Sequence, residues 1–211
     1  MKPENMSLLK TYLVENGIID IDRCIQDFEI YSDELIRWNK VINLTSIYDE
    51  KEIVIKHFID SLTPLGFIKN NDFVLDIGTG AGFPGLPLKI VKSSIKLLTL
   101  DARLKKVNFV NHVINILNIK NASSLHQRAE AEDFKSIMKG IFDVVISRAS
   151  FSLSEFINLS MPYLKIGGRI IAMRGREVEN TEPISGLKQA DELITSLPDG
   201  SYRKILLFKK T

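Results

Sequence analysis

The stretch that decides the fold is DIGTGAGFPGLP, which occupies residues 76–87. It follows a short apolar run that begins at Asp72, and it precedes a segment of helical length from Gly85 to about Val91. Glycines between a strand and a helix let the main chain approach a ligand without a clash from a Cβ atom. The stretch therefore predicts a strand–loop–helix unit with a ligand at its loop.

Strands and helices continue to alternate on the C-terminal side of this loop. A capping-box pattern, Ser152 with Glu155, opens one of the later helices, which runs to about Leu164 before Gly167 and Gly168 break it. The apolar runs predict strands over residues 72–77, 95–101, 123–127, 141–147 and 169–173.

The end of the chain predicts a hairpin. The turn sequence PDGS at residues 198–201 precedes a last apolar run at 203–208. Together with the alternation, this predicts an α/β fold with a mostly parallel, doubly wound sheet and an antiparallel C-terminal strand. Such sheets bind ligands beyond the carboxyl ends of their strands.

The N-terminal part predicts helices instead. The clearest amphipathic pattern has apolar residues at three- and four-residue steps, at Phe28, Tyr31, Leu35, Trp38 and Ile42. A third helix is expected to end near the TPLG sequence at residues 63–66. We expect residues 1–66 to form a helical extension that packs on an α/β domain of residues 67–211.

Composition narrows the class of protein. One cysteine, Cys24, excludes an internal disulfide and cysteine-rich zinc sites, and we expect no metal. No apolar run reaches the roughly 18 to 20 residues that a membrane helix needs, and the N-terminus lacks the apolar segment of a secretory signal. We therefore expect a cytoplasmic protein. Its net charge of +2 is compatible with an anionic partner.

The spacing of the loop and the acid after the next strand restrict the ligand. Dinucleotide enzymes use G-x-G-x-x-G, whereas this loop reads G-x-G-x-G followed by Phe83 and Pro84, and a proline has no N–H for a pyrophosphate. Asp101 ends the second strand, where an acidic residue meets ribose hydroxyls in nucleotide-binding folds. The pattern favours an adenosine-like ligand without a pyrophosphate.

These features resemble the Rossmann-like class I S-adenosylmethionine-dependent methyltransferases. A narrower resemblance, to the glucose-inhibited division protein B family, rests on an ordered set of motifs. The set is WNKVINLT at 38–45, His57, DS at 60–61, GFPGLP at 82–87, KK at 105–106, RAE at 128–130 and SRA at 147–149. Members of this bacterial family methylate N7 of a guanine in 16S rRNA of the small ribosomal subunit.

The resemblance implies S-adenosyl-L-methionine as the cofactor and assigns roles to residues. Three glycines, Gly78, Gly80 and Gly82, would form the floor under the amino-acid end of the cofactor, and Phe83 would close over it. Asp101 would bind the ribose. The remaining expected contacts are Ala129 and Glu130, which would flank the adenine, and Arg148, which would lie near the acceptor and pair with the cofactor carboxylate or an RNA phosphate.

The RNA side is predicted less sharply. Asn39, Lys105 and Arg174 are the candidates for contact with 16S rRNA, whereas His57 and Trp38 fit core positions. This chain departs from the family pattern at Ala102, where a serine is usual, and at Arg174, where a lysine is usual.

We expect direct in-line methyl transfer without a catalytic base, because guanine N7 carries a lone pair and no proton. Three other functions stay open at this point. They are a methyltransferase with another RNA, protein or small-molecule acceptor, a nicotinamide oxidoreductase, and a non-catalytic rRNA-binding protein with a cofactor-like pocket.

Overall fold

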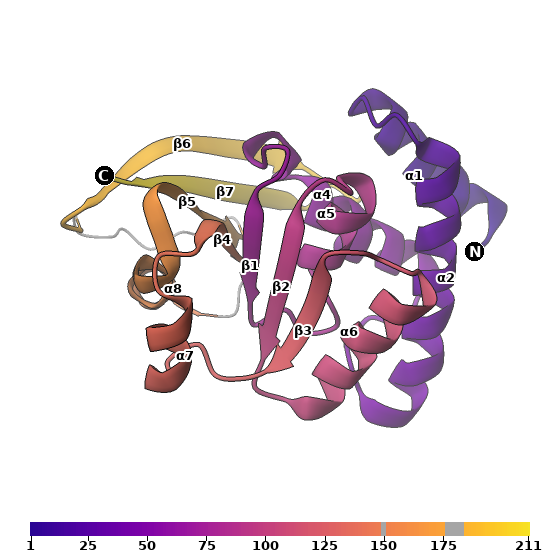
Figure 1. The fold of residues 1–211 in the computed structure, drawn as a ribbon. Helices are drawn as coiled ribbons and strands as arrows, with labels where there is room; N and C mark the ends of the chain where they lie inside the picture. The colour runs from indigo at the N-terminus through magenta and orange to yellow at the C-terminus, as the bar shows by residue number, and fades with distance from the viewer. Residues whose placement is uncertain (149–150, 176–183) are drawn as a thin grey trace.

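The computed structural model describes residues 1–148, 151–175 and 184–211 (Figure 1). Ala149, the last residue of the SRA motif, lies outside this range. In chain order the elements are α1 Pro3–Glu15, α2 Ile21–Ile42, α3 Glu50–Glu52, the π-helix η1 Ile53–Ile59, α4 Asp60–Leu62, the 3-10 helix η2 Leu65–Phe67, β1 Phe73–Ile77, α5 Gly85–Val91, β2 Lys96–Asp101, α6 Leu104–Ile116, β3 Ala122–His126, α7 Glu132–Met138, β4 Phe142–Arg148, α8 Leu153–Ser160, the 3-10 helix η3 Met161–Tyr163, β5 Leu164–Arg174, β6 Leu187–Ser196 and β7 Tyr202–Lys210.

One seven-stranded sheet organises the molecule, in the order β3-β2-β1-β4-β5-β7-β6. Strands β1 to β5 run parallel, and β7 runs antiparallel to both β5 and β6. The predicted doubly wound sheet with an antiparallel C-terminal strand is confirmed. The chain builds β1, β2 and β3 outward and then returns to the other side of β1 with β4. In doubly wound sheets ligands bind at the carboxyl ends of the strands near such a switch point.

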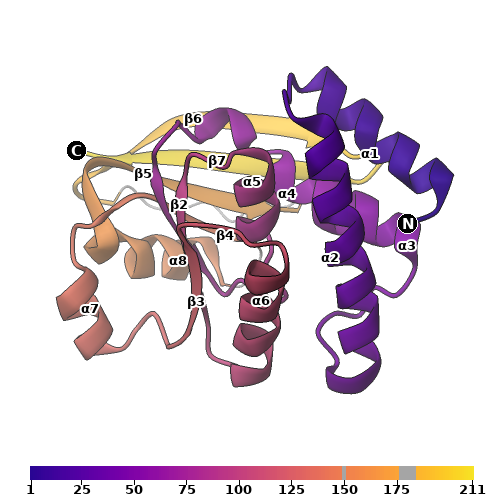
Figure 2. The same ribbon diagram turned by 45° about the vertical axis from the view of Figure 1, so that its right-hand side comes forward.

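Both faces of the central strands are buried, as expected for parallel strands covered by helices. Successive side chains of β4 alternate: Val144 and Ile146 join one apolar cluster and Val145 joins the other. Figure 2 shows α2, α5 and α6 on one side of the sheet and α7 and α8 on the other. The two helical layers therefore explain why the strand runs of the sequence are apolar without a polar alternate.

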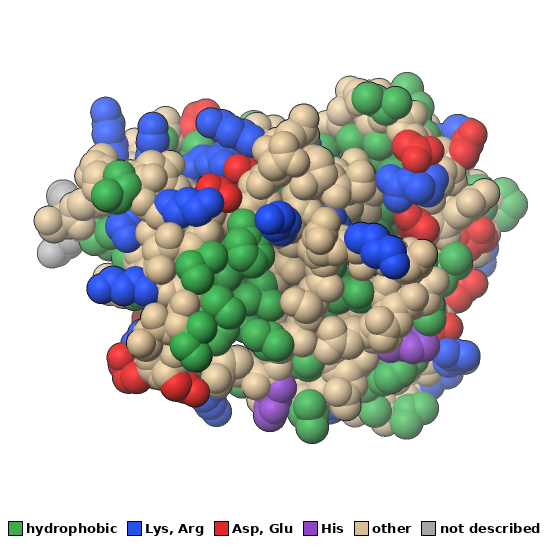
Figure 3. All heavy atoms as spheres, viewed as in Figure 1, with side chains coloured by type: hydrophobic (Ala, Val, Ile, Leu, Met, Phe, Trp, Pro, Cys, Tyr) green, Lys and Arg blue, Asp and Glu red, His purple; other side chains and the backbone are tan. Residues whose placement is uncertain are grey.

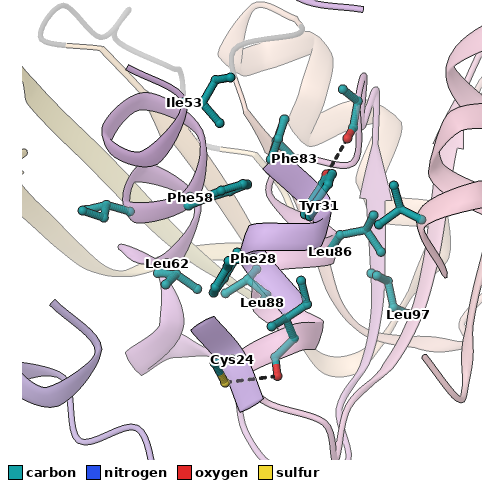
Figure 4. Packing of buried hydrophobic residues seen from close by; sticks show 14 of the residues in the cluster. Cys24, Phe28, Tyr31, Ile53, Phe58, Leu62, Phe83, Leu86, Leu88 and Leu97 are labelled. Carbon is teal, nitrogen blue, oxygen red and sulfur yellow. Dashed lines mark hydrogen bonds between the residues drawn. The ribbon is translucent and has the colours of Figure 1, made fainter. Parts of the chain in front are cut away.

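The N-terminal helices share a core with the sheet. Leu9 of α1 and Phe28 of α2 lie in the same apolar cluster as Val74 of β1. Figure 4 shows Phe28 beside Phe58, and their ring centroids are 4.8 Å apart. The extension thus packs on one face of the sheet, while a boundary at residue 66 stays a prediction.

The structure corrects two details of the predicted elements. Gly167 and Gly168 do not end an element, because β5 runs through both of them, and the strand pairing shifts register between Phe142 and Val144. A Cβ on Gly168 would lie 2.9 Å from the carbonyl oxygen of Lys165, so glycine fits this irregular part of the strand. The helix expected around residues 54–62 is divided, with the π-helix η1 in its middle.

Candidate functional site

The glycine loop leaves the carboxyl end of β1 and is held from below by Asp76. Its Oδ2 accepts hydrogen bonds from Thr79 Oγ1 at 2.6 Å and from the Gly85 N–H at 2.9 Å. Asp76 is fully buried, and this burial raises the pKa of its carboxyl to about 6 despite the two donors. A Cβ on Gly85 would lie 2.8 Å from the same oxygen. A glycine at this position lets one carboxylate hold both ends of the loop.

A cavity of about 300 Å³ opens where β1, β2 and β3 end. Four of the predicted site residues line it: Gly78, Asp101, Ala129 and Glu130. The remaining lining residues are Ile77, Leu100, Ala102, Arg103, Lys106, Gln127, Arg128 and Phe151. The cavity lies at the carboxyl edge of the sheet, where the topology predicts a ligand.

Asp101 is fixed at the mouth of the cavity by two backbone donors. Gly80 N–H donates to its Oδ2 at 3.0 Å, and Arg103 N–H donates to its Oδ1 at 2.9 Å. A carboxylate has about four acceptor positions, so each oxygen keeps capacity for a ligand hydroxyl. The side chain is only 8% exposed. Its geometry is therefore set before a ligand arrives.

Lys106 brings a positive charge to the same place. Its burial lowers the pKa of the ammonium group, while the neighbouring Asp101 carboxylate acts in the opposite direction. A Cβ on Gly80 would lie 3.6 Å from Lys106 Nζ. Sequence reasoning preferred Lys105, yet Lys105 is exposed and donates to the Ile42 carbonyl at 2.7 Å. Adjacent helical residues point about 100° apart, and the pattern does not tell which of them faces the strand ends.

Two residues of the loop face the core and do not line the cavity. Phe83, expected to close over the ligand, is 3% exposed and stacks between His57 and Tyr31, with ring centroids 4.4 and 5.4 Å away. Gly82 has φ +100°, and a Cβ there would collide with Tyr31 Oη and Leu86. Figure 4 shows Tyr31 and Phe83 side by side at the loop. The structure thus places both residues where they hold the loop against α2.

Arg148, at the end of β4, belongs to a buried polar network. Its guanidinium donates to the Lys56 carbonyl at 2.8 Å and to Asp60 Oδ2 at 3.1 Å, and lies 3.1 Å from His57 Nδ1. The other oxygen of Asp60 accepts from Arg203 Nε at 2.7 Å. Asp60 belongs to the DS motif at 60–61, but its pairing with Arg148 and Arg203 could not be predicted because the three residues come from segments far apart in the chain. In this arrangement Arg148 joins the N-terminal helices to β4.

His57 is neutral in this network. Burial lowers its pKa to about 3, and the adjacent Arg148 charge adds to the effect. Because arginine only donates, Nδ1 must accept, and the ring proton sits on Nε2 toward Thr45 Oγ1 at 3.0 Å. Both ring nitrogens are occupied. The expectation of a packed core histidine agrees with this geometry.

Like Lys105, the other two RNA candidates have internal partners. Asn39 is 2% exposed, accepts from the Leu44 and Thr45 N–H groups and donates to the Thr45 carbonyl. It shapes the loop after α2 and exposes little surface, and its contact with RNA stays a prediction. Arg174 donates to the carbonyl of Phe151, which lines the cavity.

The surface shows how charge is distributed around this region. On the face drawn in Figure 3, hydrophobic side chains gather between α7 and β2, and lysine and arginine side chains lie mainly over the β5–β7 side.

Among the described residues no group of three or more His, Cys, Asp or Glu side chains is placed to hold a metal ion. None of the helices within the described ranges combines the length and apolarity required to cross a membrane.

Solved structures share the fold of this chain. An S-adenosylmethionine-dependent methyltransferase from Aquifex aeolicus aligns with a TM-score of 0.58 at 18% identity, over 77% of this chain and 94% of that chain. A mutant of MtNAS in complex with S-adenosylmethionine aligns with a TM-score of 0.60 at 16% identity, over 98% of this chain and 78% of that chain. At such identities the likeness concerns the fold alone.

Sequence relatives are much more similar. The ribosomal RNA small subunit methyltransferase G of Lachnoclostridium phytofermentans is 41% identical over 87% of this chain and 79% of its own length. The protein of the same name from Acetivibrio thermocellus is 40% identical over 96% of this chain and 88% of its own length. The family model described as GidB, rRNA small subunit methyltransferase G, matches residues 24–193. The chain therefore belongs to the GidB family.

Proposed function

We propose that this protein transfers a methyl group from S-adenosyl-L-methionine to N7 of a guanine in the 16S rRNA of the small ribosomal subunit. The observation that carries the proposal is the cavity at the ends of β1, β2 and β3, with Gly78 and Asp101 in its wall, in a chain of the GidB family. A relative that is 40% identical over 96% of this chain is named ribosomal RNA small subunit methyltransferase G, which supports a ribosomal RNA as the acceptor. Because the proposed substrate is a ribosomal RNA, we also propose that the protein acts in the cytoplasm.

The described residues fit the cofactor. Asp101 has free acceptor positions for the two hydroxyls of a ribose, and its oxygens are oriented by the Gly80 and Arg103 N–H groups. Ala129 and Glu130 lie across the cavity and would flank the adenine. Gly78 and Gly80, both with positive φ, would offer bare main chain to the amino-acid end. When bound, S-adenosylmethionine supplies a methyl group already activated by its positively charged sulfur.

Methyl transfer to guanine N7 depends on how the acceptor nitrogen is positioned and needs no proton transfer. Guanine N7 attacks with an in-plane lone pair and releases no proton, so no side chain has to act as a base. Near the cavity, His57 has both ring nitrogens engaged and a pKa of about 3, which leaves it poorly suited to that role. Holding the nitrogen in line with the sulfur–methyl bond supplies up to about 7 to 11 kcal/mol of the barrier reduction.

The RNA would approach the rim of the cavity. Arg103, which lines the cavity, and Lys105, in the first turn of α6, are both exposed and would neutralise phosphates. Arg174 would act through Phe151, since it is bonded to the Phe151 carbonyl. Arg148 forms an ion pair with Asp60. It would therefore support the acceptor side of the site without contacting the acceptor directly. We place the substrate in the small subunit or its precursor, where the folded RNA presents the target guanine.

Transfer of a labelled methyl group tests the proposal. Purified protein and labelled S-adenosylmethionine are mixed with 30S particles, deproteinised rRNA or ribosomal proteins, and the labelled product is digested and identified. We expect N7-methylguanosine from 30S particles, and less label with the Asp101→Ala variant at the same cofactor concentration. Label in protein or in another nucleoside would contradict the acceptor, and cofactor binding without any label would favour a binding protein.

A further inference from the structure

Two buried tyrosine hydroxyls support the cavity from opposite faces of the sheet. Tyr31 belongs to the apolar cluster under the N-terminal helices, and Tyr163 belongs to the cluster under α7 and α8. We propose that Tyr31 and Tyr163 are positioning residues that set cofactor affinity. Tyr31 would act by holding the glycine loop that follows Gly78 of the cavity wall, and Tyr163 by holding Ala129 of the opposite wall. The inference rests on the proposed function, because it takes S-adenosylmethionine as the occupant of the cavity.

Tyr31 holds the glycine loop. It lies in α2, is fully buried, and its hydroxyl donates to the Ala81 carbonyl oxygen. Figure 4 shows the ring next to Phe83 with the bond drawn to the loop. The two rings stack with an interplanar angle of 17°. A Cβ on Gly82 would collide with this hydroxyl, so the third glycine of the loop makes room for Tyr31.

Tyr163 holds the opposite wall. It ends η3, is fully buried, and its hydroxyl donates to the Ala129 carbonyl oxygen. Phe134 and Phe142 pack against the ring, with centroid distances of 5.5 and 6.4 Å. Ala129 itself lines the cavity. The bond therefore ties the segment after β3, which has no regular secondary structure, to the core on the α8 side.

The two bonds act on different parts of the ligand. Tyr31 fixes the loop that would carry the amino-acid end, whereas Tyr163 fixes the wall that would carry the adenine. Neither side chain lines the cavity. Each hydroxyl would therefore affect binding only through the main chain it holds. A ligand without an amino-acid end would sense Tyr163 but not Tyr31.

Calorimetry with two ligands separates these roles. S-adenosylhomocysteine fills both ends of the site, and adenosine fills one. We expect Tyr31→Phe to raise the Kd for S-adenosylhomocysteine about 10-fold and to leave the Kd for adenosine within about 2-fold. Tyr163→Phe should raise both constants about 10-fold. Phenylalanine retains the ring, so the apolar packing is conserved.

Ser160→Ala is the matched control. Ser160 is buried and its hydroxyl donates to the Phe156 carbonyl within α8, away from the cavity. This variant should lower Tm while both dissociation constants stay at the wild-type value. Lowered Tm with wild-type constants in the tyrosine variants would overturn the proposal, because the hydroxyls would then be structural only. A wild-type protein that binds neither ligand would instead refute the proposed function.

Hydrogen exchange of the wild type gives a test without variants. A glycine loop and a cavity wall that are fixed in advance should show slow amide exchange at residues 79–83 and 128–131, respectively, in the free protein, with little change when S-adenosylhomocysteine binds. Rapid exchange in either segment before ligand is added would show that the tyrosine bonds do not order that wall. This second measurement decides the question even if a tyrosine variant does not fold.

Discussion

Asp101 is the residue on which cofactor binding should depend most. Its carboxylate receives the Gly80 and Arg103 N–H groups and still has acceptor capacity toward the cavity. Asp101→Ala removes the ribose acceptor and frees the loop, so we expect the affinity for S-adenosylmethionine to fall by about 1 to 3 kcal/mol in calorimetry. Asp143→Ala is the control, because Asp143 also accepts a backbone N–H, from Phe73 on another part of the sheet. Equal affinities for the wild type and Asp101→Ala would contradict the ribose role.

His57 makes a pH-dependent contribution to stability. Its pKa is about 3 in the folded protein, against an ordinary value of 6.5. The unfolded chain therefore binds a proton below pH 6.5 that the folded protein refuses, and the stabilisation is lost as the pH falls from 6.5 toward 3. From pH 6.5 to 4 this term amounts to about 3 kcal/mol.

Urea unfolding of wild type and His57→Gln over this pH range measures the term. Between pH 6.5 and 4, the free energy of unfolding of His57→Gln should fall by about 3 kcal/mol less than that of the wild type. The raised pKa of Asp76 has the opposite effect on the free energy of unfolding. A carboxyl whose pKa is about 6 in the folded protein stabilises the fold at low pH, and this contribution is lost as the pH rises. Both proteins share this contribution, so it cancels in the comparison. Parallel stability curves would show that folding does not lower the pKa of His57.

Sequence reasoning found part of the site at this scale. Gly78 and Asp101 could be predicted because their positions follow from strand ends and glycine spacing alone. Tyr31 could not, since its contact with Ala81 crosses fifty residues of chain and depends on how α2 packs. A buried acid one residue before the end of β1 is the pattern that could have identified Asp76 as a support of the loop.

At the scale of elements, α8 offers a defined test. The predicted capping box is confirmed, because Ser152 Oγ accepts from the Glu155 N–H and the Glu155 carboxylate accepts from the Ser152 N–H. Ser152→Ala should destabilise the protein by about 1 kcal/mol in urea unfolding. Ser136→Ala, an exposed position within α7, should change stability very little. Equal stability of Ser152→Ala and wild type would mean that the cap does not contribute.

Elements were predictable where burial imposes a period. The pattern of α2 and the apolar runs of β1, β2 and β4 gave their positions to within a few residues. Helix α7 was missed because Phe134 is its single buried residue, which leaves no apolar stripe to detect. The two glycines of β5 predict a break because glycine has a low strand propensity, and propensity is what a sequence shows. In the fold, pairing with β4 keeps the strand continuous through both glycines.

At the scale of the whole molecule, the mechanism predicts how rate depends on pH. No proton leaves guanine N7, and His57 titrates far below neutrality. Asp76, with a pKa of about 6, sets the lower limit of the window. We therefore expect single-turnover methylation of 30S particles to be flat between about pH 7 and 9. A bell-shaped profile within that range would show that a side chain exchanges a proton in the rate-determining step.

The most direct measurement of the central claim is mass mapping of modified nucleosides in 16S rRNA from cells with and without this gene. The account predicts that one guanosine carries an N7-methyl group only when the gene is present. It also predicts that a gene with Asp101→Ala restores the modification poorly. An identical set of methylated nucleosides in both strains, or a missing methyl group at any position other than guanine N7, would contradict the account.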